Sequence, residues 1–299
     1  MAEAHGTALA GRPSTALMAL HGDDPLQPDV EAVEFELLLE GIYRQYGFDF
    51  RDYAPSSLRR RVRQRMQAEK LATISALQER VLHDPSCMER LLHDLSIHVT
   101  SLFRDPTFYL TFRVKVVPLL RTYPFIRIWN AGCSTGEEAW SMAILLEEEG
   151  LGDRTRIYAT DVNESVLETA RSRRIPVRKL REYEQHYARG GGRHELSRYL
   201  AAADGDHVAF APSLGQNIHF AQHNLVSDRS FNEFHAVLCR NVLIYFGRRL
   251  QDEVHGLLHE SLVTFGVLAL GRRESIRFTR FEQSYDELDA REKLYRKVD

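Results

Sequence analysis

A strand, a turn of small residues and an amphipathic helix follow one another in the middle of this chain, and this succession limits the folds that it can adopt. Ile126–Ala131 is expected to be a strand, and Gly132–Gly136 (GCSTG) is expected to be a turn. We expect a helix from about Glu137 to Glu149, a second strand over 156–161 and a second helix over 165–172. This alternation is typical of a parallel sheet with crossover helices, and the sequence therefore predicts an α/β fold.

Two short apolar runs, 236–239 and 267–270, predict further strands of the same sheet. The segment between 176 and 222 has no comparably clear pattern. Its triple-glycine loop at 190–192 and its β-rich stretch 207–221 suggest a small insertion and not a continuation of the main sheet.

The first hundred residues show helical periodicity instead. From Val33 the apolar residues fall on one face, and a second helix is expected to begin near Ser56-Ser57, whose hydroxyls could cap it. Two more helices are expected over 73–83 and 86–97, because Asp84 precedes a proline and is pushed out of the helical region.

These patterns divide the chain into three parts. Residues 1–30 mix Ala, Gly, Pro, Thr and Asp without periodicity, and we expect a disordered tail there. A helical N-terminal domain is expected over 31–112, and the α/β domain over 113–299.

The composition excludes several classes of protein. The 299 residues are 43% hydrophobic and 27% charged, as in an ordinary globular protein. No apolar run approaches the roughly 18 residues of a membrane span, and the start lacks the basic segment of a secretory signal. We therefore expect a cytoplasmic protein without membrane insertion. Separated cysteines and scattered histidines predict neither disulfides nor a metal site.

The turn at 132–136 marks the expected ligand site. In a doubly wound sheet the crevice beyond the first strand binds nucleotides, and small residues let a ligand approach the backbone. Glu137 and Glu138 would repel a pyrophosphate, whereas they would attract a cofactor with a sulfonium and an amino group. Asp161 ends the second strand, where a carboxylate can accept hydrogen bonds from both ribose hydroxyls or, alternatively, cap the following helix.

Four segments resemble the CheR-type chemoreceptor glutamate methyltransferases in their order and spacing. They are Thr100–Pro106 (TSLFRDP), Ala131–Glu138 (AGCSTGEE), Ala159–Asn163 (ATDVN) and Cys239–Phe246 (CRNVLIYF). The similarity runs from about residue 31 to the C-terminus. It implies a Rossmann-like S-adenosylmethionine-dependent methyltransferase sheet of seven strands, a helical N-terminal domain and a small inserted β-subdomain at about 177–221.

The resemblance also assigns functional residues. It implies that Arg104 and Tyr245 are catalytic residues beside the transferred methyl group. Contacts with S-adenosylmethionine, or with its product S-adenosylhomocysteine, are implied for His98, Thr100, Arg104, Glu137, Asp161, Asn224, Leu225, Arg240 and Asn241.

The chain departs from the family's pattern at several positions. His98 stands where the family has Asn, and His235 stands where it has Asp. Leu102, Ala139-Trp140 and Arg272-Arg273 replace a Phe, a Pro-Tyr pair and a His-Ser pair. We still expect an active enzyme, because only His98 falls on an implied contact.

The arginine-rich run at 59–65 (RRRVRQR) is the strongest charge feature. It is either a solvated helix face or a binding surface within a chain of formal net charge −3. Nucleic acid is not expected, because the run lacks helix-turn-helix spacing and interleaved aromatic residues. We expect Arg59, Arg60 and Arg63 to dock on an acidic protein surface. The resemblance implies that this is the acidic helical cytoplasmic region of a membrane chemoreceptor or a similar signalling protein.

The implied reaction is methyl transfer from S-adenosylmethionine to glutamate side chains of a chemoreceptor-like protein, giving methyl esters in signalling adaptation. A glutamate side chain has a pKa of about 4.3 and is ionised at neutral pH, so the reaction needs no general base. The alternative is a non-catalytic module on the same fold that binds the cofactor or another nucleotide and regulates a partner. A small-molecule methyltransferase is disfavoured by the basic helix.

Overall fold

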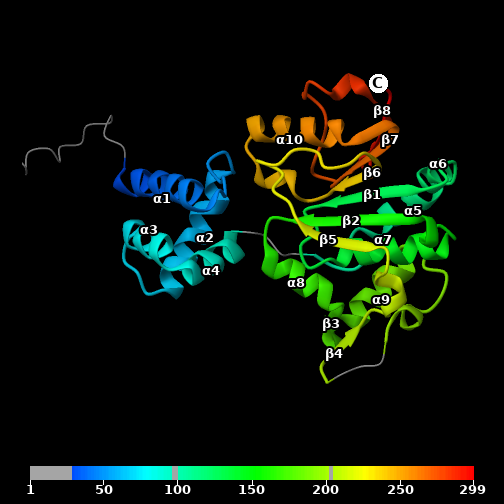
Figure 1. Ribbon diagram of the computed structural model, residues 1–299, viewed down its shortest axis with the longest axis horizontal. Helices are drawn as coiled ribbons and strands as arrows, with labels where there is room; N and C mark the ends of the chain where they lie inside the picture. Colours follow the sequence, from blue (N-terminus) through cyan, green and yellow to red (C-terminus); the bar gives the residue numbers. More distant parts are fainter. Residues whose placement is uncertain (1–28, 96–99, 202–204) are drawn as a thin grey trace, which may run out of the picture.

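A seven-stranded sheet forms the centre of the α/β part of the protein, with the strand order β5-β2-β1-β6-β7-β9-β8 (Figure 1). The computed structural model describes residues 29–95, 100–201 and 205–299. The strands are β1 (Ile126–Ala131), β2 (Thr155–Asp161), β5 (Ile218–Gln222), β6 (Phe234–Cys239), β7 (Leu262–Leu270), β8 (Tyr285–Asp289) and β9 (Leu294–Lys297). The first five are parallel, and the β8–β9 hairpin adds antiparallel strands at one edge. The expected α/β class and seven-stranded sheet are confirmed.

Side chains of the strands alternate between two hydrophobic layers. In β1, Ile126 and Ile128 belong to the layer that contains α5, α7 and α9, whereas Trp129 and Ala131 belong to the layer beneath α10. Figure 1 shows α7 and α8 on one face of the sheet and α10 on the other. The helices of this part are α5 (Pro106–Lys115), α6 (Val117–Leu120), α7 (Glu137–Glu148), α8 (Glu164–Ser172), α9 (Leu180–Arg189) and α10 (Arg248–Glu260).

Four helices form a helical domain with a core of its own. They are α1 (Val30–Tyr46), α2 (Pro55–Ala68), α3 (Ile74–His83) and α4 (Pro85–Leu95). The helix α1 begins before the expected Val33, and Asp29 caps it. No side chain caps α2, so the prediction of a cap at Ser56-Ser57 is wrong. Pro55 begins this helix, and a proline there has no N–H that would need a partner.

Disorder of the expected tail stays a prediction for residues 1–28, which lie outside the described residues, whereas Asp29 and Val30 form the start of α1. The expected boundary between 112 and 113 falls within α5. Phe108, Tyr109 and Phe112 of this helix are fully buried in the layer with α7, so α5 packs with the sheet and not with the helical domain.

The segment expected to form a separate β-subdomain divides between two structures. β3 (Arg174–Pro176) and β4 (His207–Ala209) form a small antiparallel pair, and α9 lies between them in the sequence. In contrast, β5 pairs in parallel with β2 at the edge of the main sheet. The prediction that 207–221 stands apart from the main sheet is therefore wrong for β5. The pairing joins segments that are distant in sequence, and local periodicity does not report such a contact.

Main-chain hydrogen bonds join the helical domain to the sheet. The amide of Ala54 donates to the carbonyl of Tyr245 at 2.9 Å, and the amide of Gly247 donates to the carbonyl of Asp52 at 2.6 Å. This paired strip, 52–54 with 245–247, places the start of α2 beside the segment that follows β6. In the described ranges no helix is long and apolar enough to cross a bilayer.

A buried arginine holds three elements together below the carboxyl edge of the sheet. Arg240 follows β6, and its guanidinium donates to Asp105 Oδ2 at 3.0 Å and to Glu138 of α7. The guanidinium also lies 3.8 Å from the ring centroid of Phe108 in α5. Burial opposes the charge, but Glu138 and Asp105 outweigh it and raise the pKa of Arg240. The ion cluster therefore links β6, α7 and the start of α5.

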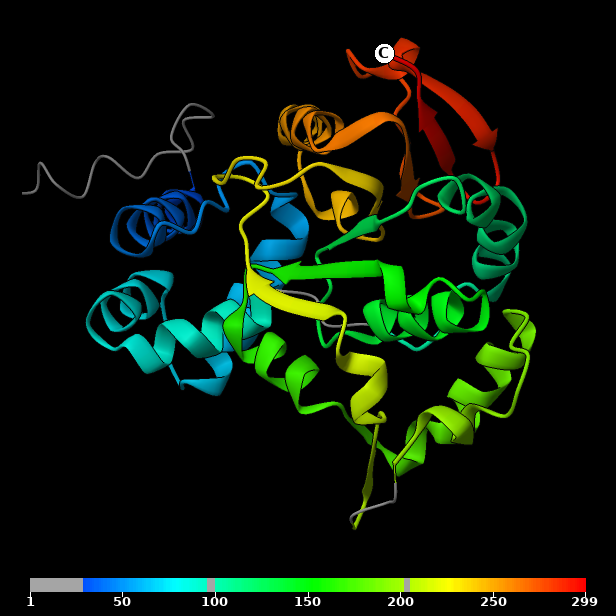
Figure 2. The ribbon, with the colours of Figure 1, turned by 45° about the vertical axis from the view of Figure 1, so that its right-hand side comes forward.

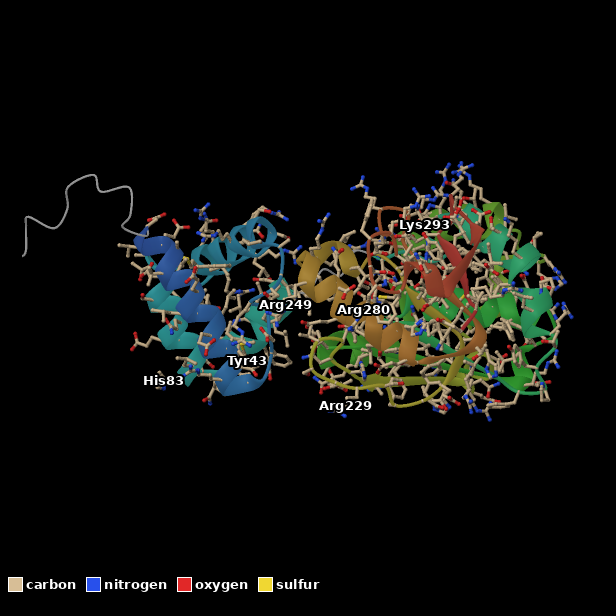
Figure 3. The ribbon with its side chains drawn as sticks, turned by 90° about the horizontal axis from the view of Figure 1, so that it is seen from above. Tyr43, His83, Arg229, Arg249, Arg280 and Lys293 are labelled. Carbon is tan, nitrogen blue, oxygen red and sulfur yellow. The ribbon has the colours of Figure 1, made fainter. Side chains whose placement is uncertain are left out.

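We expect the Arg240→Met variant to lose about 3–5 kcal/mol of unfolding free energy, because it leaves two carboxylates without their shared cation. Urea denaturation of the wild type and the variant measures this loss. Arg229→Met is the matched control, since Arg229 is exposed at the surface (Figure 3) and should change stability by less than about 0.5 kcal/mol. Equal denaturation midpoints for Arg240→Met and wild type would show that the cluster adds no net stability.

Candidate functional site

A pocket opens at the carboxyl ends of β1, β2 and β6. β1 lies between β2 and β6 in the sheet, so this is the point where the strand order reverses and ligands bind in doubly wound folds. The helical domain closes one side, at the left of Figure 2. The pocket is lined by Phe50, Tyr53, Leu95, Gly132, Ser134, Asp161, Val162, His223, Asn224, Leu225, Val226, Asn241, Val242, Tyr245 and Phe246.

Gly132 allows the turn after β1 to pass close to the segment that follows β6. Its φ is +74°, and a Cβ atom at this position would lie 2.5 Å from Cγ2 of Val242. The amides of Gly132 and Cys133 both donate to the carbonyl of Thr160 at 2.8 Å, which fixes the turn against the end of β2. A side chain at Gly132 would therefore push the two walls of the pocket apart.

Asp161 lies at the end of β2 with both carboxylate oxygens on main-chain donors. Oδ2 accepts from the amide of Ser134 at 2.9 Å, and Oδ1 accepts from the amide of Asn163 at 3.1 Å. Burial raises the pKa of Asp161, while these amides act in the opposite direction. Asn163 itself caps α8 by accepting from the amide of Ser165. Asp161 is therefore not the helix cap, and each of its oxygens retains capacity for a further hydrogen bond.

The pocket has the chemistry of a nucleoside site without a phosphate site. Leu225, Val242 and Phe246 offer apolar surface for a base, and Asp161 offers acceptors for ribose hydroxyls. The buried Ser134 hydroxyl has no hydrogen-bond partner among the described residues, so it is available to a ligand. The described lining contains no lysine or arginine to neutralise a phosphate. These residues fit S-adenosylmethionine, whose only permanent cation is a sulfonium.

The two glutamates after the turn, Glu137 and Glu138, accept hydrogen bonds from other side chains of the protein. Glu137 is buried, and its carboxylate accepts from Thr135 Oγ1 at 2.6 Å and from the hydroxyl of Tyr183 in α9 at 3.2 Å. Glu138 accepts from Asn130 Nδ2 at 2.7 Å and from Arg240. Glu137 is thus not among the residues that line the pocket, and the Arg240 guanidinium is directed into its ion cluster.

Arg104 and Tyr245 come from distant segments but lie close enough to interact electrostatically. Burial raises the pKa of Tyr245, whereas the positive charges of Arg61 and Arg104 lower it, and the net direction is upward. The phenol is therefore protonated at neutral pH and can donate a hydrogen bond. Tyr245 lines the nucleoside pocket, and Arg104 lines a second pocket next to Asp105.

Glu274 is a site residue that sequence reasoning missed. Its buried carboxylate accepts from the amides of Asn241 at 2.9 Å, Val242 at 2.8 Å and Ile244 at 3.3 Å. It thereby fixes the segment that carries Asn241 and Tyr245 into the pocket. The sequence did offer a signal for this residue. In the run 271–274 the family's first and last residues, Gly and Glu, are kept, although Arg272-Arg273 replace the His-Ser pair between them.

The remaining expected cofactor contacts are placed as follows. Asn224 and Leu225 line the pocket, and Asn224 Oδ1 accepts from the amide of Val226 at 3.0 Å. Asn241 also lines it, in a left-handed conformation with φ 62°. Thr100 is half-buried at the start of the second described range, whereas His98 lies outside the described residues.

The departure at His235 lies away from the pocket. His235 is at the amino end of β6, where its Nδ1 accepts from the amide of Arg127 at 2.9 Å and its ring packs on Tyr123. Burial lowers the pKa of this histidine, so the ring stays neutral at neutral pH. The pocket is at the opposite end of the same strand, and this substitution does not alter it.

The arginine run of α2 is less uniformly exposed than its sequence suggests. Arg60 is exposed, Arg59 is half-buried against the ring of Phe35, and Arg63 forms an ion pair with Glu31. Arg61 points inward, and its Nη1 donates to the carbonyl of Leu95 at 2.7 Å. Arg61 was expected in the basic face, yet it is buried beside the pocket and influences Tyr245.

No group of three or more His, Cys, Asp or Glu side chains within the described ranges is arranged to hold a metal ion. The described cysteines are buried and unpaired. Burial raises the pKa of Cys133 and of Cys239, so neither is an activated thiol.

Comparison with known proteins agrees with this geometry. Residues 33–96 match the family described as "CheR methyltransferase, all-alpha domain", and residues 98–293 match "CheR methyltransferase, SAM binding domain".

Several curated proteins are similar over most of the chain. "Putative methyltransferase Cher3" of Pseudomonas putida is 47% identical over 89% of this chain and 97% of its own length. A "Chemotaxis protein methyltransferase" of Listeria monocytogenes is 27% identical over 83% of this chain and 92% of its own length. An uncharacterized 104.1 kDa protein of Rhodobacter capsulatus is 31% identical, and the match covers 26% of that longer protein. The chain thus belongs to the CheR family, and it is an S-adenosylmethionine-dependent methyltransferase.

Proposed function

We propose that this enzyme transfers the methyl group of S-adenosylmethionine to glutamate side chains of a chemoreceptor-like protein in the cytoplasm, giving methyl esters in signalling adaptation. The observation that carries the proposal is the position of Tyr245 between the nucleoside pocket and two positively charged side chains. This protonated phenol borders the nucleoside pocket and lies within the electrostatic influence of Arg61 and Arg104. Two arginines and a hydrogen-bond donor suit an anionic acceptor such as a carboxylate.

The chemistry requires alignment of the reactants and no proton transfer. S-adenosylmethionine supplies the methyl group, and S-adenosylhomocysteine leaves when the carbon–sulfur bond breaks. The glutamate carboxylate is already ionised at neutral pH, so its oxygen attacks without a general base. Holding that oxygen behind the methyl carbon can lower the barrier by about 7–11 kcal/mol.

Each residue has a role in this proposal. Asp161 binds the ribose hydroxyls, and Asn224 with Leu225 contacts the adenine. Arg104 orients the acceptor carboxylate through its planar guanidinium, and Tyr245 hydrogen-bonds beside the reacting atoms. His98, Thr100 and Asn241 are proposed contacts of the methionine portion. Glu137 and Arg240 act from behind the pocket, by holding the turn after β1 and the segment after β6.

The proposed partner is the acidic helical cytoplasmic region of a membrane chemoreceptor or a similar signalling protein. Arg59, Arg60 and Arg63 of α2 are the arginines expected to dock on it. Of these three, Arg60 is both exposed and without an ion pair among the described residues. Arg59 and Arg63 flank it on α2. The strip at 52–54 and 245–247 joins α2 to the segment that carries Tyr245, so a protein docked on α2 is held beside the site.

The reaction is tested by incubating the purified enzyme with tritiated S-adenosylmethionine and receptor-rich membranes. We expect label on protein that alkali releases as methanol, because carboxyl methyl esters hydrolyse in base and N-methyl groups do not. Alkali-stable label would exclude the ester and assign a different acceptor atom.

We expect Asp161→Asn to weaken S-adenosylhomocysteine binding about tenfold to a hundredfold. The change removes the negative charge and replaces one acceptor oxygen by a donor. Hydrogen bonds from the ribose hydroxyls to a charged group contribute about 1.5–3 kcal/mol. Calorimetry measures the affinity, and thermal unfolding without ligand reports damage to the turn. Asp153→Asn is the control, since Asp153 is exposed near the opposite end of β2. Wild-type affinity in Asp161→Asn would remove the ribose assignment.

We expect Tyr245→Phe and Arg104→Lys to lower kcat while S-adenosylhomocysteine affinity stays within about twofold of wild type. The first variant loses only the hydroxyl, and the second keeps the charge but loses the planar fork. Single-turnover methylation separates the chemical step from product release. Wild-type rates in both variants would leave these side chains as packing around the cofactor.

We expect Arg60→Gln to raise KM for the protein substrate by up to about fivefold, as for an exposed ion pair, without changing cofactor affinity. The effect should shrink at high salt, because exposed charges are screened beyond about 8 Å at 0.15 M ionic strength. Methylation kinetics over a salt series measures KM for the protein substrate and its dependence on ionic strength, with Arg229→Gln as the control. An equal KM change in Arg60→Gln and Arg229→Gln would show a general charge effect and no docking at α2.

A further inference from the structure

A second pocket lies beside the nucleoside pocket, and four arginines line it. Arg104 precedes α5, Arg189 ends α9, Arg272 follows β7, and Arg291 lies in the β8–β9 hairpin. Asp105 and His186 complete its polar lining. Elements from four separate parts of the sequence thus direct cationic side chains to one hollow.

The carboxylates at this hollow, Glu292 and Asp105, are already paired with arginines. Glu292 is buried and accepts two hydrogen bonds from Arg272, at 3.1 and 2.8 Å. Asp105 accepts from Arg240 at 3.0 Å. Arg189 is exposed and has no ion pair in the described part of the chain. Arg291 is 77% exposed, and its Nε lies 3.7 Å from Glu292 Oε1. The hollow therefore keeps an excess of positive charge that its own residues do not neutralise.

The hollow is at the same edge of the sheet as the nucleoside pocket. β7 ends at Leu270 and β9 is antiparallel to it, with Leu294 opposite Ala269, so the β8–β9 turn lies at the carboxyl edge of the parallel strands. Figure 3 shows side chains tipped with nitrogen gathered near the labelled Lys293 of this hairpin. In the strand order, β7 and β9 lie on the side of β6 away from Asp161 and β2.

Arg104 connects the two pockets. It lines the arginine hollow, and its charge influences Tyr245 in the nucleoside pocket. The segment before it is held against α9, because Ser101 Oγ donates to Glu182 Oε1 at 2.8 Å. A substrate chain that presents one side chain to Arg104 would therefore place its neighbouring residues over Arg189 and Arg291.

We propose that this arginine hollow binds a second carboxylate of the protein substrate, an Asp or Glu side chain close to the glutamate that is methylated. The inference rests on the proposed function, and it assigns to Arg189 and Arg291 the selection of an acidic sequence around the acceptor. Arginine side chains bind carboxylates through paired N–H donors. Phe, Tyr and Trp are absent from the residues that line the hollow, so it lacks the large aromatic side chains on which successive nucleic acid bases stack.

Direct binding tests the hollow without any methyl transfer. The probe is fluorescein-labelled hexaglutamate at low ionic strength, followed by anisotropy, with hexaglutamine as the neutral probe. We expect Arg189→Gln/Arg291→Gln to bind hexaglutamate about tenfold more weakly than wild type. Arg181→Gln is the matched control, because Arg181 is exposed on the same helix but does not line the hollow.

Three results of the binding test would overturn the inference. They are wild-type affinity in the double variant, an equal loss in Arg181→Gln, and absence of hexaglutamate binding by the wild type. An oligothymidylate probe serves as the nucleic acid alternative. If the double variant loses more affinity for oligothymidylate than for hexaglutamate, the hollow is assigned to nucleic acid instead.

Methylation kinetics then separates this inference from the proposed function. On a purified receptor fragment we expect the double variant to raise KM about tenfold, while kcat and S-adenosylhomocysteine affinity stay at wild-type values. Replacing the acidic neighbours of the methylated glutamate by glutamine should raise KM for the wild type and change little for the double variant. Alkali-stable label with intact hexaglutamate binding would reject glutamate methylation alone, whereas alkali-labile label with an unchanged KM would reject the arginine hollow alone.

Discussion

One buried carboxylate organises the segment on which the rest of the site depends. Glu274 binds the amides of Asn241, Val242 and Ile244, and it forces this stretch into a tight turn after β6. Val242 then packs against Gly132 and closes the pocket from the side of β1. The same carboxylate also accepts from the amide of Gly271. An unsatisfied buried amide is costly, so four amides on a single carboxylate make an alternative path for this turn unfavourable.

The site therefore consists of two kinds of wall. The turn after β1 and the end of β2 are fixed by the parallel sheet itself, through Thr160 and Asp161. The wall after β6 is fixed by side-chain contacts from the C-terminal part of the chain and by the helical domain. The sheet determines where a nucleoside fits, and the second wall determines which groups face the reacting atoms. Tyr245 belongs to this second wall, and the charges of Arg61 and Arg104 act on it.

Local patterns in the sequence predict the first wall well. The strand β1, its turn, α7 and β2 were placed nearly to the residue, because alternation and helical periodicity are properties of consecutive residues. The position of β5 and the burial of Arg61 were not predictable in this way. Each depends on a partner far along the chain, β2 for the strand and the last carbonyls of α4 for the arginine. Glu274 was overlooked for the same reason, since three of the four amides that it binds lie some thirty residues earlier.

The strip between 52–54 and 245–247 has a consequence for how relatives of this protein can diverge. Its hydrogen bonds join main-chain atoms only, from Ala54 to Tyr245 and from Gly247 to Asp52. Substitutions on the surface of the helical domain leave this attachment intact, whereas a side chain at Gly247 would disturb it, because its Cβ would lie 2.7 Å from the carbonyl oxygen of Asp52. The helical domain is therefore free to change its surface, and with it the proteins that it recognises, while the distance from that surface to the methyl-transfer site stays constant.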